Sequence, residues 1–337
     1  MTPRHRLVRA AALAVTALTL TACTTTHPTA TPSPAHHIPA AQRPLVTRAQ
    51  AQRILDHYVR VNNQANAKLA DAPLRTIETD PLLAIDEQAN RQLRTYSRKD
   101  QAEDQKPFYY TKPVYYIPAA GHATWFAVEV TGTGPAWKPP SKRLLIFDHT
   151  GAAGYKMATT VDLTSRLPRI ATDRNSCALV STPSTTVTRQ FQQALADLYD
   201  GGHSDGTLFG TSPARGWITN DTKDTAKHLA PYADAVYRDI STSTDNRRLA
   251  GRTYALATAD GGILAVTLDR VQMNAFPTSP TAYIKPGRAE AAYTGHHRLD
   301  NLTVDYAHQT ASYVSSSGQA RLLGLDRDVV QATGVSE

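Results

Sequence analysis

The sequence predicts an α+β protein with two tandem domains, each built of helices packed on a curved antiparallel sheet. Three observations favour this class. Apolar residues recur at helical spacing after residue 47, β-rich segments with period-two alternation follow between residues 108 and 160, and the same order of helices and strands returns loosely after residue 188. Helices followed by an antiparallel meander are typical of α+β domains.

The chain begins with the layout of a bacterial signal peptide, predicted at residues 1–22. Three arginines, at positions 4, 6 and 9, precede an apolar run from Ala10 to Leu20. This run is too short for a membrane-spanning helix, which needs about 20 apolar residues. It leads into Leu20-Thr21-Ala22-Cys23, which resembles the lipobox of bacterial lipoproteins. The resemblance implies cleavage before Cys23, a lipid on its sulfur, and an anchor at the outer face of the cell membrane.

An ordinary secreted protein with a cysteine near its cleavage site is the alternative, and it leaves an exposed thiol unexplained. The sequence holds two cysteines, Cys23 and Cys177. Lipidation of the first leaves the second without a partner, so we expect no internal disulfide. Cys177 stands among small and apolar residues and no histidine motif points to it, so we expect a small buried residue rather than a nucleophile.

Residues 23–45 are rich in Thr, Pro and Ala, and they contain five prolines. Such a segment cannot bury a core, and we expect an extended, disordered tether. Without the three arginines of the leader, 33 basic residues stand against 29 acidic ones. The charges are interspersed and form no basic stripe, so we expect no nucleic-acid partner.

The first domain is predicted at residues 46–165 and opens with a helical hairpin. Thr47 suits a helix N-cap, and Pro81 suits the first turn of a second helix. The apolar stripes of the two helices are Ile54, Tyr58, Val61, Ala65 and Leu69, and Leu82, Ile85, Ala89 and Leu93. Four strands of an antiparallel meander follow, predicted at 108–117, 124–130, 143–148 and 153–160.

The second domain is predicted at residues 180–330, after a boundary in the weakly periodic stretch 162–186. Helices are predicted at 188–199 and 224–240. Strands are predicted at 253–258, 263–272, 299–315 and 320–325, with tight turns at 259–262 and 316–319. The element order of both halves is similar to that of cystatin-like and nuclear-transport-factor-like folds, an analogy that carries no function.

Three asparagines of the first helix are candidate ligand-binding residues. Asn62 and Asn66 lie one turn apart with Asn63 beside them, so their amides project from a common side toward a polar ligand such as a sugar. The alternative is that these amides hold a neighbouring loop or the second helix by hydrogen bonds. Tyr116 and Trp125 belong to a dense aromatic set on the predicted strands. Alternation leaves half of that set outside the core, available to a glycan, a peptide or a protein.

Two sets of residues suit a hydrolase. Gly202-His203-Ser204-Asp205-Gly206 matches the nucleophile-elbow pattern, which needs a strand before Ser204 and a helix after it. Here a predicted helix precedes it and loop-like sequence follows. Glu129 and Asp148 lie in predicted strands, and they suit glycoside hydrolysis only with roughly 5–9 Å between them in a cleft.

Histidines give no regular metal-binding pattern. His296 and His297 are adjacent and His308 follows, yet neighbouring residues of a strand point to opposite faces. A zinc site needs three or four regularly spaced ligands. We therefore expect no metal, no cofactor and no catalytic residue.

The segment Tyr58–Asn66 resembles a group of actinobacterial secreted lipoproteins, of the Streptomyces type, whose function is unassigned. Further similarities are Leu82-Leu83 with Glu87, Phe108 with Tyr116 and Pro118, Trp125–Val128 and Leu144–Phe147. The likeness covers residues 45–160 well and the remainder loosely. It implies an envelope lipoprotein and brings no catalytic residues.

Taken together, these patterns predict a cell-surface lipoprotein that acts as a non-catalytic binding or assembly module of the bacterial envelope. Its expected contacts are the membrane, through the lipid on Cys23, and an envelope protein or a glycan. Two alternatives stay open. One is an envelope hydrolase that uses Ser204 or a carboxylate pair, and the other is a lipoprotein that captures a small ligand on the concave face of a sheet.

Overall fold

The computed structural model describes residues 43–135, 139–183, 190, 193–194, 218, 233–240, 253–295 and 298–336. Within the chain, residues 41–337 form one compact unit. Several predicted features lie outside the described residues: the leader with Cys23, the tether up to residue 42, Ser204, His296 and His297.

Four helices open the described part of the chain. α1 (Arg48–Asn66) begins at Thr47, as predicted, and Thr47 and Gln50 cap each other's backbone N–H groups at 3.2 and 2.7 Å. α3 (Leu82–Leu93) begins directly after Pro81, which confirms the second predicted helix. The short helices α2 (Asp71–Ile77) and α4 (Arg98–Asp104) have too few apolar repeats for periodicity to predict them.

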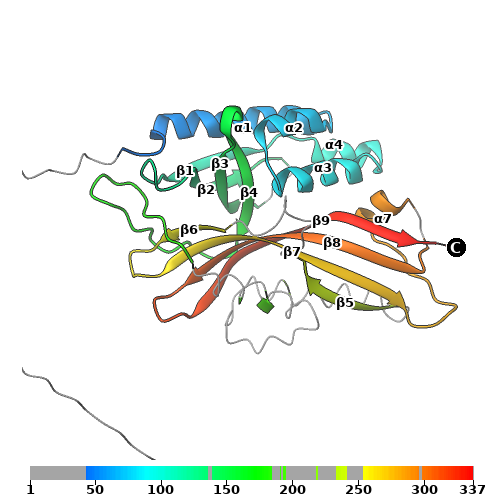
Figure 1. Cartoon of the computed structure of the whole chain (residues 1–337). Coiled ribbons are helices and arrows are strands. Elements are labelled where there is room, and N and C mark those ends of the chain that lie inside the picture. Colours follow the sequence, from blue (N-terminus) through cyan, green and yellow to red (C-terminus); the bar gives the residue numbers. More distant parts are fainter. Residues whose placement is uncertain are drawn as a thin grey trace, which may run out of the picture. The chain divides into compact units, whose positions relative to one another are not determined.

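The predicted meander of four strands is confirmed. β1 (Tyr109–Tyr116), β2 (Trp125–Thr133), β3 (Ser141–His149) and β4 (Tyr155–Leu163) pair antiparallel in sequence order, with a 3₁₀ turn at Gly151–Ala153 before β4. Figure 1 shows α1–α4 gathered on one side of these strands.

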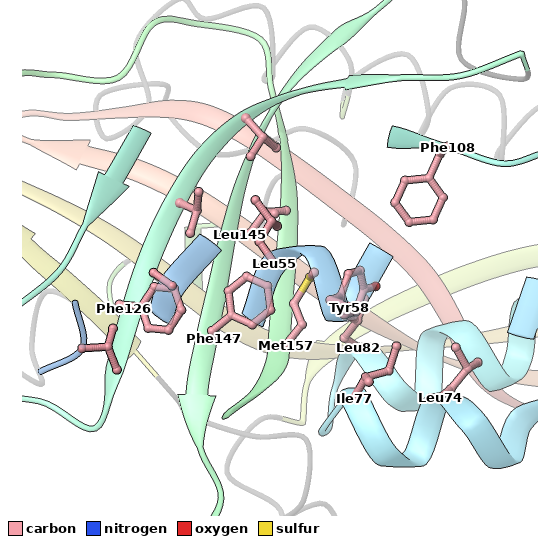
Figure 2. Packing of buried hydrophobic residues seen from close by; sticks show 14 of the residues in the cluster. Leu55, Tyr58, Leu74, Ile77, Leu82, Phe108, Phe126, Leu145, Phe147 and Met157 are labelled. Carbon is pink, nitrogen blue, oxygen red and sulfur yellow. The ribbon is translucent and has the colours of Figure 1, made fainter. Parts of the chain in front are cut away.

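The first core lies between these helices and the meander. Every second residue of β2 and β3 faces the helices, because side chains alternate along a strand. Figure 2 shows Leu55 and Tyr58 of α1 among Leu145, Phe147 and Met157 of the strands, and all five belong to one buried cluster. The two layers are therefore held by a continuous apolar contact.

The second half contributes the longest strands. Its elements are β5 (Ala233–Asp239), β6 (Thr253–Ala257), β7 (Ile263–Pro277), α7 (Arg288–Thr294), β8 (Asn301–Val314) and β9 (Ala320–Val335). The predicted turns after β6 and β8 are confirmed, with Gly261 at φ 81° and Gly318 at φ 84°, where glycine is free of strain. β9 extends ten residues beyond the predicted strand end at Leu325.

The prediction of a helix at residues 224–240 is wrong where it can be compared with the structure. Residues 233–239 form β5, which pairs along its whole length with β7. Exposure alternates along β5, with Asp234, Val236 and Arg238 outside and Tyr237 packed on a core cluster. The long edge of β7 supplies hydrogen-bond partners for the backbone of β5, so tertiary pairing overrides the helical spacing. Of the other predicted helix, residues 190, 193 and 194 are described and are helical.

One antiparallel sheet joins the described strands of both halves. Its order is β1-β2-β3-β4-β9-β8-β7-β5, and β6 also pairs with β7. β4 and β9 meet at one register pair, Leu163 with Gly324. A Cβ atom on Gly324 would lie 2.2 Å from the backbone oxygen of Asp162, so this approach requires glycine.

A second core buries the face of the meander that points away from the helices. Trp125 and Ile146 of the meander pack there with Leu256, Val266 and Leu323 of the second half. The structure thus shows a mixed α and β protein with a large antiparallel sheet. The division into domains at 46–165 and 180–330 and the likeness to cystatin-like or nuclear-transport-factor-like folds are not confirmed.

We expect the two halves to unfold as one cooperative unit. Phe147→Ala in the first core and Leu302→Ala in the second half should each lower the free energy of unfolding by about 2–5 kcal/mol, because each opens a buried cavity. Both variants should move the same single transition in differential scanning calorimetry. Val114→Ala, at a side chain that is 45% exposed, should change stability by less than about 0.5 kcal/mol. Two transitions, each moved by one variant only, would show independent domains.

Candidate functional site

Two of the predicted asparagines join a buried polar network under α1. Asn62 Nδ2 donates to Tyr58 Oη at 3.0 Å and to Glu78 Oε1 at 2.9 Å. Tyr58 Oη donates to the same Glu78 oxygen at 2.9 Å, and Asn66 Nδ2 donates to Asn62 Oδ1 at 2.8 Å. Tyr58, Asn62 and Glu78 are all buried. The one-turn spacing of Asn62 and Asn66 thus brings their amides together, and Glu78 accepts at the end of the network.

Glu78 is paired with a second carboxyl group, that of Asp86 in α3. The Oε2 atom of Glu78 is buried and accepts no hydrogen bond from an N–H or O–H group of the described residues. The carboxyl groups of Glu78 and Asp86 share a hydrogen bond, which requires a proton on one of them. Burial, followed by the charge of Asp86, raises the pKa of Glu78 well above its usual range. Burial also raises the pKa of Asp86 to about 6.

Asp86 faces a cavity of about 190 Å³, which Asn62 and Asn66 also line. On the strand side the cavity reaches Arg143 of β3. Arg143 Nη2 donates to Asp162 Oδ2 at 2.9 Å, and the N–H of Asp162 donates to Asp326 Oδ2 at 3.0 Å. Burial raises the pKa of Asp326 to about 7; the charge of Asp162 adds to this and Arg143 opposes it. This smaller cavity is lined mostly by polar and charged side chains, and Asp86 and Asp104 are its acidic residues.

A larger cavity of about 400 Å³ lies between α3, α7 and the strands β7–β9. Its volume falls in the usual range of small-molecule sites, about 300–1,000 Å³. Apolar side chains line part of it, among them Ile85, Met273, Leu302 and Val329. Charged and polar groups of α3, α7 and β9 line the rest. The two halves of the sequence therefore build this cavity together.

Gln88 is the most deeply buried polar group of the larger cavity, with 4% of its surface exposed. Its Nε2 donates to the backbone oxygen of Ala289 in α7 at 3.1 Å, which fixes the orientation of the amide. The other end of the amide, Oε1, is buried and has no hydrogen-bond partner among the described residues. An unsatisfied buried acceptor costs roughly 1–3 kcal/mol of stability.

Cation–π contacts hold α7 beside α3. Arg91 of α3 lies 4.8 Å from the ring centre of Tyr293, and Arg288 of α7 lies 4.6 Å from that of Tyr96. Tyr293 also donates to the backbone oxygen of Val330 in β9. These contacts and the Gln88 bond hold together the two helices that line this side of the cavity.

The other candidate binding residues lie elsewhere. Asn63 bonds the backbone of Phe108 twice, at 2.8 and 3.0 Å, so it holds the segment before β1, which is the alternative role considered for these amides. Tyr116 and Trp125 face the second core, on the opposite side of the sheet from Asn62. Trp125 packs edge-on against Tyr254, and Tyr116 donates to Glu129 at 3.1 Å. The structure therefore does not bring the asparagines and these aromatic residues into one site.

Glu129 and Asp148 do not form a glycosidase pair. Glu129 stands opposite Leu144 in β3, four residues before Asp148, which corresponds to roughly 13 Å along a strand. Each carboxylate has its own partners: Glu129 binds Lys142 and Tyr116, and Asp148 binds Thr124 and Tyr254. The carboxylate version of the hydrolase hypothesis is therefore wrong for these two residues.

Cys177 and His308 are both buried among the described residues. Cys177 is buried, as predicted, and burial together with the charge of Asp173 raises the pKa of its thiol. His308 is buried in β8, and burial and the neighbouring Arg327 lower its pKa to about 3, so it stays neutral. Within the described ranges, no group of three or more His, Cys, Asp or Glu side chains is placed to hold a metal ion.

Sequence reasoning missed the residues that define both cavities, chiefly Asp86, Gln88 and Arg143. A signal was present for Asp86. It stands four residues after Leu82 and seven before Leu93, on the apolar stripe of α3, where an acidic side chain is out of place. The sequence around Gln88 and Arg143 gives no comparable signal, because the burial of these two residues depends on α7 and β9.

The Glu78–Asp86 pair makes stability depend on pH. A carboxyl group whose pKa is raised on folding stabilises the fold below its unfolded pKa, and this contribution is lost as pH rises through the folded pKa. For Asp86 that window runs from its ordinary 3.8 to about 6. Asp86→Asn removes the part of this dependence that comes from Asp86, while burial still raises the pKa of Glu78 in both proteins. The difference in melting temperature, variant minus native, should therefore fall as the pH is lowered from about 8 to about 5.

His308 acts in the opposite direction, since its pKa is lowered on folding, but it is present in both proteins and cancels. Asp234→Asn, at an exposed position, is the matched control and should give a constant difference. Melting curves at a series of pH values measure both variants. A constant difference for Asp86→Asn as well would show that Asp86 does not bear a raised pKa.

Comparison with known proteins gives a family and a relative. A family model described as "Domain of unknown function (DUF8094)" matches residues 42–334. The chain is 28% identical over 308 residues to an uncharacterised lipoprotein of Streptomyces coelicolor, covering 87% of this chain and 84% of that one. Among the described residues, no helix has the length and apolar character needed to cross a membrane. The resemblance to Streptomyces lipoproteins is thereby confirmed, and the chain belongs to the DUF8094 family.

Proposed function

We propose that this protein is a lipoprotein held at the outer face of the cell membrane by a lipid on Cys23, and that its folded part is a non-catalytic binding module. The leader and the segment Leu20–Cys23 support the anchor. The similarity to a Streptomyces lipoprotein over most of both chains supports it independently. The Thr- and Pro-rich segment that follows would lift the folded part away from the membrane.

The larger cavity carries the binding part of the proposal. It has the volume of a small-molecule site, and it combines an apolar floor with a few converging polar groups. Gln88 lines the cavity, and its bond to Ala289 fixes its side chain in place. A preformed cavity with a fixed lining favours binding because little ordering remains to be done. Capture of a small ligand is therefore the form of binding that we favour.

Catalysis has less support. Glu129 and Asp148 are too far apart to act together, and Ser204 lies outside the described residues. Asp86 has a pKa suited to acid–base chemistry, but its hydrogen bond to the buried Glu78 gives it a structural partner. A binding module accounts for these groups without a reaction.

The lipid anchor predicts a specific loss. When the full chain is produced in an actinobacterial host with an alkyne-labelled palmitate, the membrane fraction should contain labelled protein. Cys23→Ala should lose the label and the membrane association, because the sulfur that receives the lipid is gone. Cys177→Ala is the matched control and should keep both. A labelled, membrane-bound Cys23→Ala protein would refute the anchor.

If the larger cavity is the binding site, a variant whose new side chain fills it should no longer bind the ligand. We expect at least one class in a panel of sugars, amines, carboxylic acids, amino acids and dipeptides to raise the melting temperature of the detergent-solubilised full chain. A ligand at 100 times its Kd contributes about 2.7 kcal/mol. Ala89→Trp should abolish this rise, because Ala89 lines the cavity and is exposed to it. Ala102→Trp, on the exposed surface of α4, should keep it.

A panel in which no class raises the melting temperature would count against ligand binding. So would a rise that is equal in the native chain and in Ala89→Trp. Either result would turn attention to a protein partner on the cell surface.

A further inference from the structure

We propose that the larger cavity takes a zwitterionic ligand of the amino-acid or short-peptide type, with an aliphatic side chain. This inference rests on the proposed binding function and names the ligand class. Two features of the cavity carry it: charged side chains of both signs, and a mainly aliphatic apolar wall.

The acidic side chains favour a ligand that donates hydrogen bonds. Asp328 and Glu290 line the cavity, and their carboxyl oxygens accept hydrogen bonds. An ammonium group supplies up to three donors and matches this set of acceptors.

Cationic groups line the same cavity. Lys285, before α7, and Arg327, in β9, both contribute to its wall. A carboxylate is the natural partner of an ammonium and a guanidinium group, and such charge-assisted bonds are about twice as strong as neutral ones. The lining holds two cationic and two acidic side chains, so a ligand with one charge of each sign keeps the net charge of the cavity unchanged.

The apolar residues favour an aliphatic group over a sugar ring. Met273, Leu302 and Val329 belong to one buried cluster and form a continuous apolar surface. Sugar sites commonly offer an aromatic face, and Tyr306 is the aromatic residue among those that line this cavity. The guanidinium of Arg327 lies 4.3 Å from the ring centre of Tyr306 and covers one face of it. A branched aliphatic side chain fits such a surface better than a hydroxylated ring does.

The test compares a whole ligand with its two halves on the detergent-solubilised full chain. The probes are leucine, 4-methylpentanoate, which lacks the ammonium group, isoamylamine, which lacks the carboxylate, and N-acetylglucosamine. Calorimetric titration should show leucine or alanyl-leucine binding roughly tenfold more tightly than either half, because each half loses one set of charge-assisted bonds. N-acetylglucosamine should not bind.

Two variants should divide the probes by charge. Lys285→Met should lower the affinity for leucine and for 4-methylpentanoate roughly tenfold, and it should leave the affinity for isoamylamine unchanged. Asp328→Asn should lower the affinity for leucine and for isoamylamine, and it should leave the affinity for 4-methylpentanoate unchanged. Lys285 is exposed, so its replacement does not threaten folding. Lys142→Met and Asp234→Asn, both exposed and outside the cavity lining, are the matched controls and should bind like the native chain.

The outcomes separate this inference from the proposed function. If leucine and one of its halves bind with equal affinity, the ligand is not recognised as a zwitterion, but the proposed binding function stands. The same holds if N-acetylglucosamine binds and Ala89→Trp abolishes that binding. No response to any probe or panel compound would overturn both. Leucine binding that neither charge variant changes would place the ligand outside this cavity and overturn the inference.

Discussion

The close approach of β4 and β9 at Leu163 and Gly324 is the constraint on which the rest of the described fold depends. The two strands share one register pair, so most of the outer edge of β4 cannot be satisfied by a regular ladder. Side chains of the second half take over part of that role: Gln309 accepts the N–H of Thr160 at 3.1 Å, and Asp326 accepts that of Asp162 at 3.0 Å. Backbone groups that are buried must find partners, and here polar side chains supply them.

The same constraint positions both cavities. Because α1–α3 are fixed on the meander, joining β4 to β9 brings α3 over the strands of the second half, where it meets α7 through Gln88 and Arg91. The consequence is a set of carboxyl groups with raised pKa values near the join, including Asp86 and Asp326. Buried acidic groups cost stability, and they persist here as acceptors for backbone and amide donors.

Sequence patterns predict the local elements of this protein and fail at its long-range contacts. Thr47 and Pro81 mark the helix starts and Gly261 marks a hairpin turn, because capping and turn geometry depend on a few neighbouring residues. The spacing of apolar residues in the β5 segment predicts a helix, because that spacing carries no information about the pairing of β5 with β7. The site follows the same rule. The spacing of Asn62 and Asn66 places them together, whereas the partner Glu78 and the cavity beside Gln88 arise only when distant segments meet.

The central claim is that both halves of the sequence build one ligand site, and hydrogen exchange with added leucine tests it most directly. Binding in the larger cavity should slow exchange together in α3 and in the segments of β9 and α7 that line it, while the β1–β2 hairpin keeps its rate. Slowed exchange in both halves at the same leucine concentration is the predicted result. Protection confined to one half, or protection located in the β1–β2 hairpin, would contradict the account.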